Sequence, residues 1–234
     1  PHVVYVLNRG GRFEDFARAY KDGQLTNKYG KLVAIYMENL LRTKNSMTGK
    51  PYLHYADYVS GPRDCMDNLL DDEKQGFDLT LLTYKAVTQT KSRTAGNYWL
   101  QAAYPENFIE INSRDATRLG LKSGDRVKVV SASNPEGVWN IGPGKQKPMV
   151  GKVKVIEGIR PGHITFSLGH GHWANGAGDL SIDGHPVAGD SRRATGVHAN
   201  AAMRVDPVLK NTCLLDPVAG SAVFYQTQVK LLKA

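Results

Sequence analysis

YPENFIEINSRDATRLGLKSGDRVKVVS, residues Tyr104–Ser131, is the stretch that decides the fold class of this chain. The apolar run Phe108–Ile111 is typical of a strand. Asn112 is a preferred N-cap residue and Gly120 is a preferred residue just past a helix end, so we expect a short helix over Ser113–Leu119. This stretch therefore predicts a sheet whose strands are joined by a short, capped helix.

Strand patterns continue on both sides of this stretch. Arg126–Ser131 (RVKVVS) and Met149–Ile156 (MVGKVKVI) alternate apolar and polar residues, as half-buried strands do. We expect further strands at Leu79–Tyr84, Ile164–Leu168 and Phe224–Leu232. No repeat with a period of roughly 20–50 residues is present. The expected fold is mainly β with short helices (α+β), arranged as a barrel.

Residues 1–78 differ from the rest of the chain. They hold 11 Lys and Arg and 11 Asp and Glu. We expect a strand at Val3–Leu7, a helix at Phe13–Tyr20 and a strand running into a helical turn at Lys31–Leu41, followed by loops. A neutral, loop-rich segment is typical of the tail of a preceding domain with its linker, so we place a domain boundary near residue 78.

Composition excludes several classes of protein. Apolar residues make up 41% and charged residues 22% of the 234 residues, which excludes wholesale disorder. No apolar run reaches the roughly 18 residues of a membrane-spanning helix. Cys65 and Cys213 are the only cysteines, which excludes a disulfide scaffold, a zinc ribbon or an iron–sulfur cluster held by this chain alone. The sequence begins at Pro1 without a leader, so we expect any targeting segment to be removed or to lie elsewhere.

The net charge of +8 lies entirely in residues 79–234, which hold 19 Lys and Arg and 11 Asp and Glu. A local cationic excess favours an anionic partner, which could be nucleic acid, a lipid surface or a phosphorylated ligand. A basic surface that serves only solubility explains the same charge.

Lys85–Thr94 (KAVTQTKSRT) follows one of the expected strands, and we call it the donor-rich loop. It holds two Lys, one Arg, four hydroxyl side chains and one Gln, with no acidic residue. At the end of a strand such a loop can bind a phosphate or pyrophosphate. A solvated basic loop explains the composition equally well. The P-loop motif GxxxxGK[ST] is absent and no GxGxxG opens a helix, which disfavours ATPase and Rossmann sites.

Asp115 has two interpretations of equal weight. In the first, its carboxylate only caps the helix that begins after Asn112. In the second, it accepts hydrogen bonds from paired N–H donors, such as those on the edge of a guanine base.

Gly169–Trp173 (GHGHW), which we call the histidine loop, opens the glycine-rich segment Gly169–Gly220. Segments of this length without secondary structure are uncommon unless they serve a site. Two His in an HxH pattern could bind a metal. A third ligand at standard spacing and an HExxH motif are both missing, so we expect a structural or hydrogen-bonding role.

From about Leu79 to its end, the chain resembles the C-terminal molybdopterin-dinucleotide-binding domain of the dimethyl-sulfoxide-reductase superfamily. The resemblance rests on LLTYKAVTQTKSRT, on the frame PE-x-F-x-E-I-N…D-A-x-x-L-G-L-x-x-G-D-x-V-x-V, on GKVKVIEGIRPGHITFSLGHG and on the terminal FYQTQVKLL. The stretches GVHANAAMRVDPVLKNTCLLDPVAGSAVFY and NRGGRF are most similar to the tetrathionate-reductase and arsenate-respiratory-reductase branch.

This resemblance implies a double-psi β-barrel with a loop-rich N-terminal extension, which holds two molybdopterin guanine dinucleotides (bis-MGD) carrying Mo or W. It identifies no catalytic residue, and it implies no metal ligand in this chain. The residues expected along one dinucleotide are Tyr84, Lys85, Thr88, Gln89, Thr90 and Arg93. Those expected at a guanine end are Asn112 and Asp115. Those expected at the pterin side are His170, His172, Trp173, Asn200, Asn211 and Gln226.

Catalytic subunits of this family are several times longer than this chain and often carry a [4Fe–4S] centre. The resemblance therefore implies one part of an oxidoreductase that reduces a sulfur or arsenic oxyanion in anaerobic respiration, and that is not catalytically complete alone. The implied partners are the remainder of the catalytic chain, an iron–sulfur electron-transfer subunit and a membrane anchor, without nucleic acid. The expected location is the periplasmic side of the cell envelope, with a cytoplasmic location as the alternative. The alternative is a cofactor-free double-psi barrel that acts as an adaptor for protein or nucleic acid.

Overall fold

The computed structural model describes residues 20–25, 36–142, 145–174 and 176–234. The chain divides into two compact units. The first comprises Pro1–Lys44 and Lys50–Tyr58, and the second comprises Asn45–Gly49 and Val59–Ala234. The domain boundary expected near residue 78 stays a prediction.

The described part of the first unit contains short elements. Strands β1 (Tyr20–Lys21) and β2 (Gln24–Leu25) form a hairpin. Helix α3 (Glu38–Arg42) has five residues and an ion pair of 2.6 Å between Glu38 and Arg42. It confirms the helical turn expected near residue 41. The strand expected at residues 3–7, and residues 13–19 and 31–35 of the other two expected elements, lie outside the described residues.

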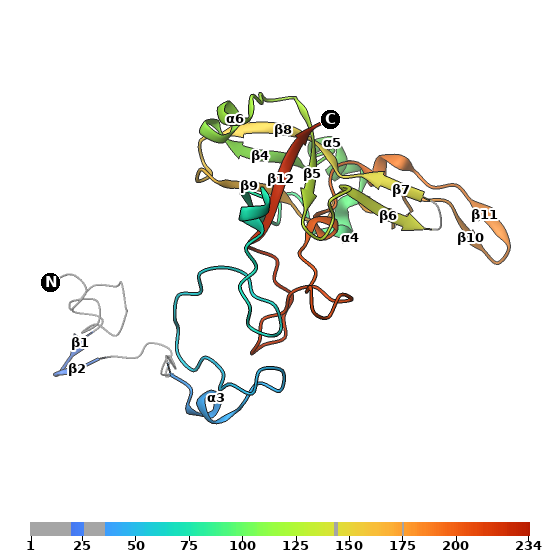
Figure 1. Ribbon diagram of the computed structural model, residues 1–234. Helices are drawn as coiled ribbons and strands as arrows, with labels where there is room; N and C mark the ends of the chain where they lie inside the picture. Colours follow the sequence, from blue (N-terminus) through green and yellow to red (C-terminus); the bar gives the residue numbers. More distant parts are fainter. Residues whose placement is uncertain (1–19, 26–35, 143–144, 175) are drawn as a thin grey trace. The chain divides into compact units, whose positions relative to one another are not determined.

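Six strands of the second unit close into a barrel in the order β12-β3-β9-β4-β8-β5 (Figure 1). Their bounds are β3 Leu79–Tyr84, β4 Phe108–Asn112, β5 Arg126–Ser131, β8 Val150–Ile156, β9 His163–Ser167 and β12 Thr227–Lys233. The expected fold class, mainly β with short helices and a barrel, is confirmed. The last strand begins at Thr227 and not at Phe224, and both Phe224 and Tyr225 are exposed.

Two of the six neighbouring pairs in the barrel are parallel, β3 with β9 and β4 with β8, and the other four are antiparallel. In the first parallel pair Tyr84 lies opposite Ser167, the last residue of β9. The two strands therefore end at the same rim of the barrel. The chain that follows each of them starts from neighbouring points.

Alternation along the strands produces the core. Along most of each barrel strand every second residue is buried, and hydrophobic burial of this kind is the main source of stability. The buried residues are Leu79, Leu81, Ile109, Ile111, Val127, Val129, Val153, Ile164, Phe166, Val229 and Leu231. The apolar residues that alternate along these strands in the sequence therefore form the inner face of the barrel.

Helix α6 (Ser113–Leu119) forms where the sequence predicts it. The Asn112 side chain accepts a hydrogen bond from the Arg114 N–H at 2.9 Å, and Gly120 adopts the left-handed conformation (φ 61°). Helices α4 (Ser92–Ala95) and α5 (Tyr98–Ala103) were not predicted. Asn97 caps α5 by accepting from two backbone N–H groups, so a local signal for this helix was present.

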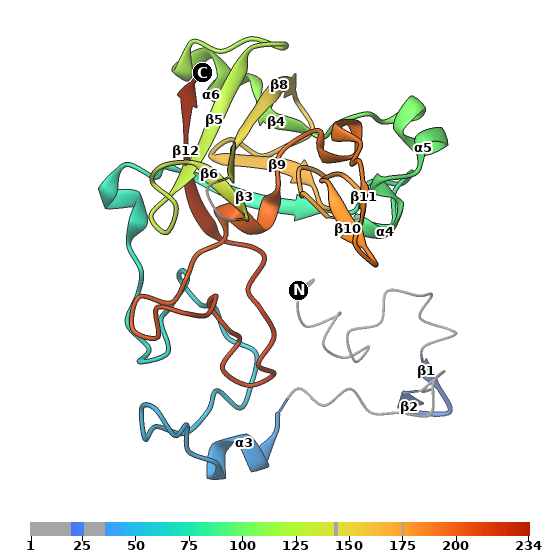
Figure 2. The ribbon, with the colours of Figure 1, turned by 90° about the vertical axis from the view of Figure 1, so that its right-hand side faces the viewer.

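Short hairpins extend from the barrel. They are formed by β6 (Val138–Gly142) with β7 (Lys145–Pro148), and by β10 (Leu180–Ile182) with β11 (His185–Val187). Short 3-10 helices occupy η1 (Asp72–Gln75), η2 (Ser191–Ala194) and η3 (Ala199–Ala202). The long glycine-rich segment is thus ordered over much of its length. Both views place α4, α5 and the β10–β11 hairpin on one side of the barrel (Figure 2).

Two distant segments of the second unit are fastened together outside the barrel. The Arg204 guanidinium donates to both carboxylate oxygens of the buried Asp72, at 2.7 and 3.1 Å. The carboxylate of Asp206 accepts from the Cys65 N–H at 2.8 Å.

Across the described residues, no helix is long and apolar enough to span a membrane.

Close packing of β8 against the chain at Val197 generates a prediction. A Cβ added at Gly151 would lie 2.6 Å from the Val197 Cγ2 and 3.0 Å from the Ile109 Cδ1. We expect Gly151→Ala to lower the free energy of unfolding by about 1–3 kcal/mol through overpacking. The matched control is Gly158→Ala, because a Cβ at Gly158 meets nothing within 4 Å. Urea denaturation of both variants measures the effect, and equal stability of the two would contradict this account of the packing.

Candidate functional site

The donor-rich loop and the histidine loop leave the barrel at the same rim. The donor-rich loop (residues 85–94) follows β3, and the histidine loop (residues 169–173) follows β9 by one residue. The Leu168 N–H donates to the Tyr84 carbonyl at 2.8 Å, which extends the parallel pairing beyond the strand ends. Loops positioned by a rigid scaffold commonly carry the binding residues of a protein. This geometry makes the rim the candidate site.

The two loops touch through their backbones. Gly169 has a φ of +98°, and a Cβ at this position would lie 2.5 Å from the Lys91 carbonyl carbon. Lys91 itself has a φ of 59°, which is uncommon for a residue other than glycine. Only glycine at position 169 allows this approach, so the loops are packed as one surface.

Hydroxyl and amide groups hold the donor-rich loop in shape. The Thr94 hydroxyl donates to the Gln89 Oε1 at 2.8 Å and accepts from the Thr90 N–H at 2.7 Å. The Gln89 side chain is buried, and its Nε2 has no hydrogen-bond partner among the described residues. A buried amide donor without a partner is costly, so this atom is a candidate contact for a ligand.

The cations of this loop are available to a ligand. Lys85, Lys91 and Arg93 are exposed, and in the described part of the chain none of them forms an ion pair. Thr88 is exposed as well. By contrast, Lys152 on β8 is paired with Glu106 at 2.5 Å. The loop therefore presents unneutralised positive charge beside the exposed Thr88 side chain.

Tyr84 closes β3 at the base of the same loop. It is half-buried, and burial together with a hydrogen bond to Tyr104 raises the pKa of its phenol. The phenol therefore stays protonated at neutral pH and acts as a neutral hydrogen-bonding group.

The two imidazoles of the histidine loop are buried and neutral. Burial lowers the pKa of both His170 and His172, and for His172 the charge of Lys147 lowers it further. In the part of the chain that the structure describes, Nδ1 of His170 and Nε2 of His172 have no hydrogen-bond partner. Within the described residues no cluster of three His, Cys, Asp or Glu could hold a metal ion. The pair is thus suited to hydrogen bonding with a ligand.

A third histidine, which sequence reasoning missed, joins this pair. The His198 ring lies 6.0 Å from the His172 ring and 4.3 Å from the Trp139 ring, measured between centroids. Burial lowers the pKa of His198 to about 4. Gly171 allows the approach, because a Cβ there would lie 2.4 Å from the His198 backbone nitrogen.

Asn107 was also missed, although it is fully buried. Its Nδ2 donates to the carbonyls of Ser167 at 2.7 Å and Val197 at 2.9 Å, and its Oδ1 accepts from the Val197 N–H at 2.7 Å. It thereby joins the end of β9 to the segment that carries His198. The only sequence signal was a polar residue at the start of an apolar strand.

The predicted guanine contacts, Asn112 and Asp115, make hydrogen bonds within the chain. The Asn112 Nδ2 donates to the Ile159 carbonyl at 2.8 Å. The Asp115 carboxylate accepts from the Gly162 N–H at 2.6 Å and pairs with Arg118 at 3.2 Å. Both side chains are buried, and both have a structural function at α6.

The remaining predicted residues are dispersed. The half-buried Trp173 indole packs on Gly178. Gln226 is exposed and precedes β12, which runs antiparallel to β3, so it lies at the rim where β3 ends. Asn200 is exposed in η3, beside His198. Asn211 is exposed in a loop held by Asp206, outside the barrel.

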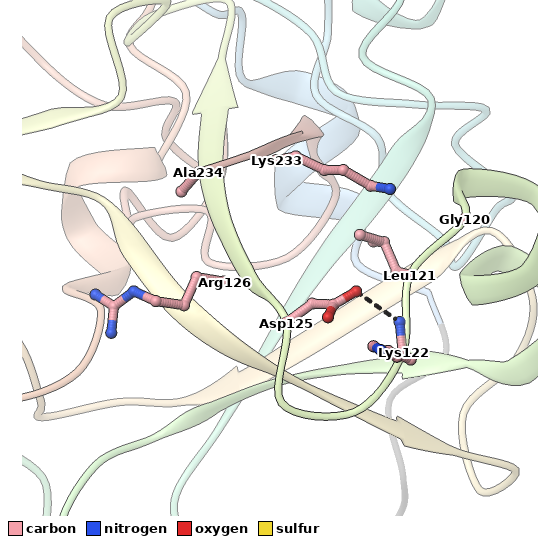
Figure 3. A pocket seen from close by; sticks show the side chains of 7 residues that line it. All are labelled: Gly120, Leu121, Lys122, Asp125, Arg126, Lys233 and Ala234. Atoms are coloured by element: carbon pink, nitrogen blue, oxygen red, sulfur yellow. Dashed lines mark hydrogen bonds between the residues drawn. The ribbon is translucent and has the colours of Figure 1, made fainter.

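A depression lies elsewhere, at the ends of α6 and β12 (Figure 3). Its lining residues are Gly120, Leu121, Lys122, Asp125, Arg126, Lys233 and Ala234. The side chains of Arg126 and Lys233 point to different sides, and the Asp125 carboxylate accepts from the Lys122 N–H at 3.0 Å. The cations do not converge, so this depression lacks the arrangement of an anion site.

A family model described as "Molydopterin dinucleotide binding domain" matches residues 79–141. A selenate reductase subunit from Mesobacillus selenatarsenatis is 43% identical over 230 residues, which are 98% of this chain and 22% of that protein. A tetrathionate reductase subunit from Salmonella typhimurium is 29% identical over 227 residues, 94% of this chain and 20% of that protein. The chain spans about a fifth of the length of these relatives.

A solved structure has the same fold. Acetylene hydratase from Pelobacter acetylenicus matches 76% of this chain with 21% of its own, at a TM-score of 0.51 and 16% sequence identity. The family match supports the cofactor-binding interpretation over the cofactor-free adaptor. The family model and the two reductase subunits together show that the chain contains a molybdopterin-dinucleotide-binding domain, similar to that of reductase subunits of the dimethyl-sulfoxide-reductase family.

Proposed function

We propose that this chain is the cofactor-binding part of an oxidoreductase that uses molybdenum or tungsten bis-MGD to reduce an oxyanion of sulfur, selenium or arsenic. The observation that carries the proposal is the 43% identity with a selenate reductase over 98% of the chain. The rim formed by the donor-rich and histidine loops supports it, because that rim offers the donors a dinucleotide needs.

The chemistry of the rim fits such a ligand. Lys85, Thr88, Thr90 and Arg93 would bind the phosphate oxygens through ammonium, hydroxyl and guanidinium donors. The unpartnered Gln89 Nε2, His170 Nδ1 and His172 Nε2 would complete their hydrogen bonding on the same ligand. We propose Tyr84, Trp173, Asn200, Asn211 and Gln226 as further contacts.

Asn112 and Asp115 are proposed at a guanine end, beyond their function at α6. A carboxylate has about four lone-pair sites, and Asp115 uses two oxygens for two bonds within the chain. The remaining lone pairs can accept from the guanine edge. The Asp115 carboxylate would then hydrogen-bond the guanine base and the chain's own Gly162 and Arg118 at the same time.

When bound, the metal and its dithiolenes supply the redox chemistry. The residues of this chain bind the dinucleotides, orient them against the barrel rim and exclude water from one side of them. Because His170 and His172 are neutral, their imidazoles add no further positive charge to the site.

We further propose that the unit works with the rest of a larger catalytic subunit, which carries the metal ligand and a [4Fe–4S] centre. A membrane anchor at the periplasmic side of the cell envelope and an iron–sulfur electron-transfer subunit would complete the assembly.

The proposal is tested on the enzyme purified from its source. Molybdenum and tungsten are measured by mass spectrometry, pterin by fluorescence after oxidation, and guanine nucleotide after acid hydrolysis. Metal and pterin in a 1:2 ratio support the proposal. An enzyme without pterin refutes it.

The exposed cations of the donor-rich loop generate a prediction. We expect the double substitution Lys85→Gln and Arg93→Gln to lower the pterin-to-protein ratio severalfold with little change in stability, because exposed cations without partners add little to folding. The matched control is Lys122→Gln with Arg126→Gln, which removes the same charge at the depression of Figure 3. Equal pterin content in the two double variants would refute a phosphate-binding function for this loop.

Asp115 generates a second prediction, which separates its two functions. We expect Asp115→Asn to lower the free energy of unfolding by about 1–2 kcal/mol, because an amide is a weaker acceptor for the Gly162 N–H and loses the Arg118 pair. If the carboxylate also binds guanine, the variant loses nucleotide as well. Arg118→Gln is the control, since it removes this ion pair, together with the Arg118–Asp78 pair, and leaves the Asp115 carboxylate. Equal nucleotide content in both variants would show that Asp115 serves only the fold.

Exposed apolar side chains in the first unit generate a third prediction. Tyr36, Met37, Leu53 and Tyr55 are about half exposed and Tyr58 is 85% exposed. Apolar surface of this kind usually marks a contact with another polypeptide. We expect residues 1–234 expressed alone to self-associate, and co-expression with the rest of the catalytic chain to prevent this. Size-exclusion chromatography measures the outcome, and a monodisperse monomer that binds the cofactor tightly would contradict it.

A further inference from the structure

Lys147 reaches from the β6–β7 hairpin to the candidate site. It lies on β7, and its half-buried ammonium donates to three backbone carbonyls. These belong to Gly171 at 3.4 Å, to Gly196 at 3.1 Å and to Ala194. An ammonium group has three N–H donors and no acceptor, so its hydrogen-bonding capacity is matched by the three carbonyls.

The three carbonyls belong to two segments that pair at this point. Gly171 is the centre of the histidine loop, and its N–H donates to the Thr195 carbonyl at 2.8 Å. Ala194 and Gly196 flank Thr195. The histidine loop and residues 194–197 therefore form a backbone junction, which the Lys147 ammonium closes. Lys147 is far in sequence from both segments.

The charge of Lys147 has no carboxylate partner among the described residues. Glu106, the acid that acts on it at longer range, is paired with Lys152. Burial lowers the pKa of Lys147. A cation without an ion pair, held by carbonyl dipoles, costs desolvation that an ordinary surface lysine avoids. The neighbouring β7 residue Lys145 illustrates the contrast, because it is exposed.

We propose that Lys147 is a positioning residue, which fastens the histidine loop to residues 194–197 and so holds His170, His172 and His198 in place at the cofactor rim. Its link to the cofactor rests on the function proposed above. The fastening itself rests only on the contacts of the three carbonyls.

The test uses the cofactor-loaded enzyme that contains this chain, with three variants. Lys147→Met keeps the length of the side chain and removes charge and donors. Lys147→Arg keeps the charge and offers five donors. Lys145→Met is the matched control on the same strand. Hydrogen–deuterium exchange is followed by mass spectrometry in peptides covering residues 168–174 and 194–198, and pterin release is followed after dilution.

In Lys147→Met we expect amide exchange at Gly171 and Val197 to rise on the order of tenfold, because opening of this junction no longer breaks three charge-assisted hydrogen bonds. Pterin release rises as well, and Lys147→Arg restores part of both. Peptides of β5 and β12, and the Lys145→Met enzyme, behave as in the parent. If side-chain length alone held the junction, Lys147→Met would exchange like the parent enzyme, and Lys147→Arg would have nothing to restore.

Unchanged exchange in Lys147→Met, or the same change in Lys145→Met, overturns the fastening. Raised exchange with unchanged pterin release overturns the link to the cofactor. If Lys147→Met does not fold, Lys147→Gln, which keeps two donors without the charge, is measured by the same criteria. A parent enzyme without pterin would refute the proposed function, and the exchange experiment would still decide whether Lys147 fastens the junction.

Discussion

The parallel pairing of β3 with β9 is the constraint on which the rest of the site depends. Strands that run side by side in the same direction must end at the same rim, and a closed barrel prevents either from shifting past its neighbours. Tyr84 therefore lies opposite Ser167, and the two loops begin within one hydrogen bond of each other. Their close contact at Gly169 and Lys91 follows from this register.

Buried polar groups then give the rim its shape. Asn107 ties the end of β9 to Val197, and Lys147 ties the histidine loop to the carbonyls of Ala194 and Gly196. Both side chains bond to backbone groups, which occupy fixed positions, and so both specify one arrangement of the loops. The imidazoles held between them stay neutral because burial disfavours their charged form.

Positive charge is used in two ways on this unit. On β8, Lys152 and Lys154 are neutralised by Glu106 and Glu110, so they contribute no net field at the barrel wall. In the donor-rich loop the cations have no such partner among the described residues, and the loop offers its charge to an anion from outside. The net charge of +8 alone did not distinguish these two uses, because a net charge does not show which acidic residues lie near each cation.

The sequence by itself determined the barrel strands and α6, since alternation, the Asn112 cap and Gly120 are local signals. It also located the donor-rich and histidine loops and the family resemblance. Only the tertiary structure revealed Asn107, Lys147 and His198 at the rim, because their contacts join residues 24 to 90 positions apart. It likewise decided that Asp115 binds Gly162. A side chain's partners across such separations are set by how the barrel closes, and no local pattern encodes that closure.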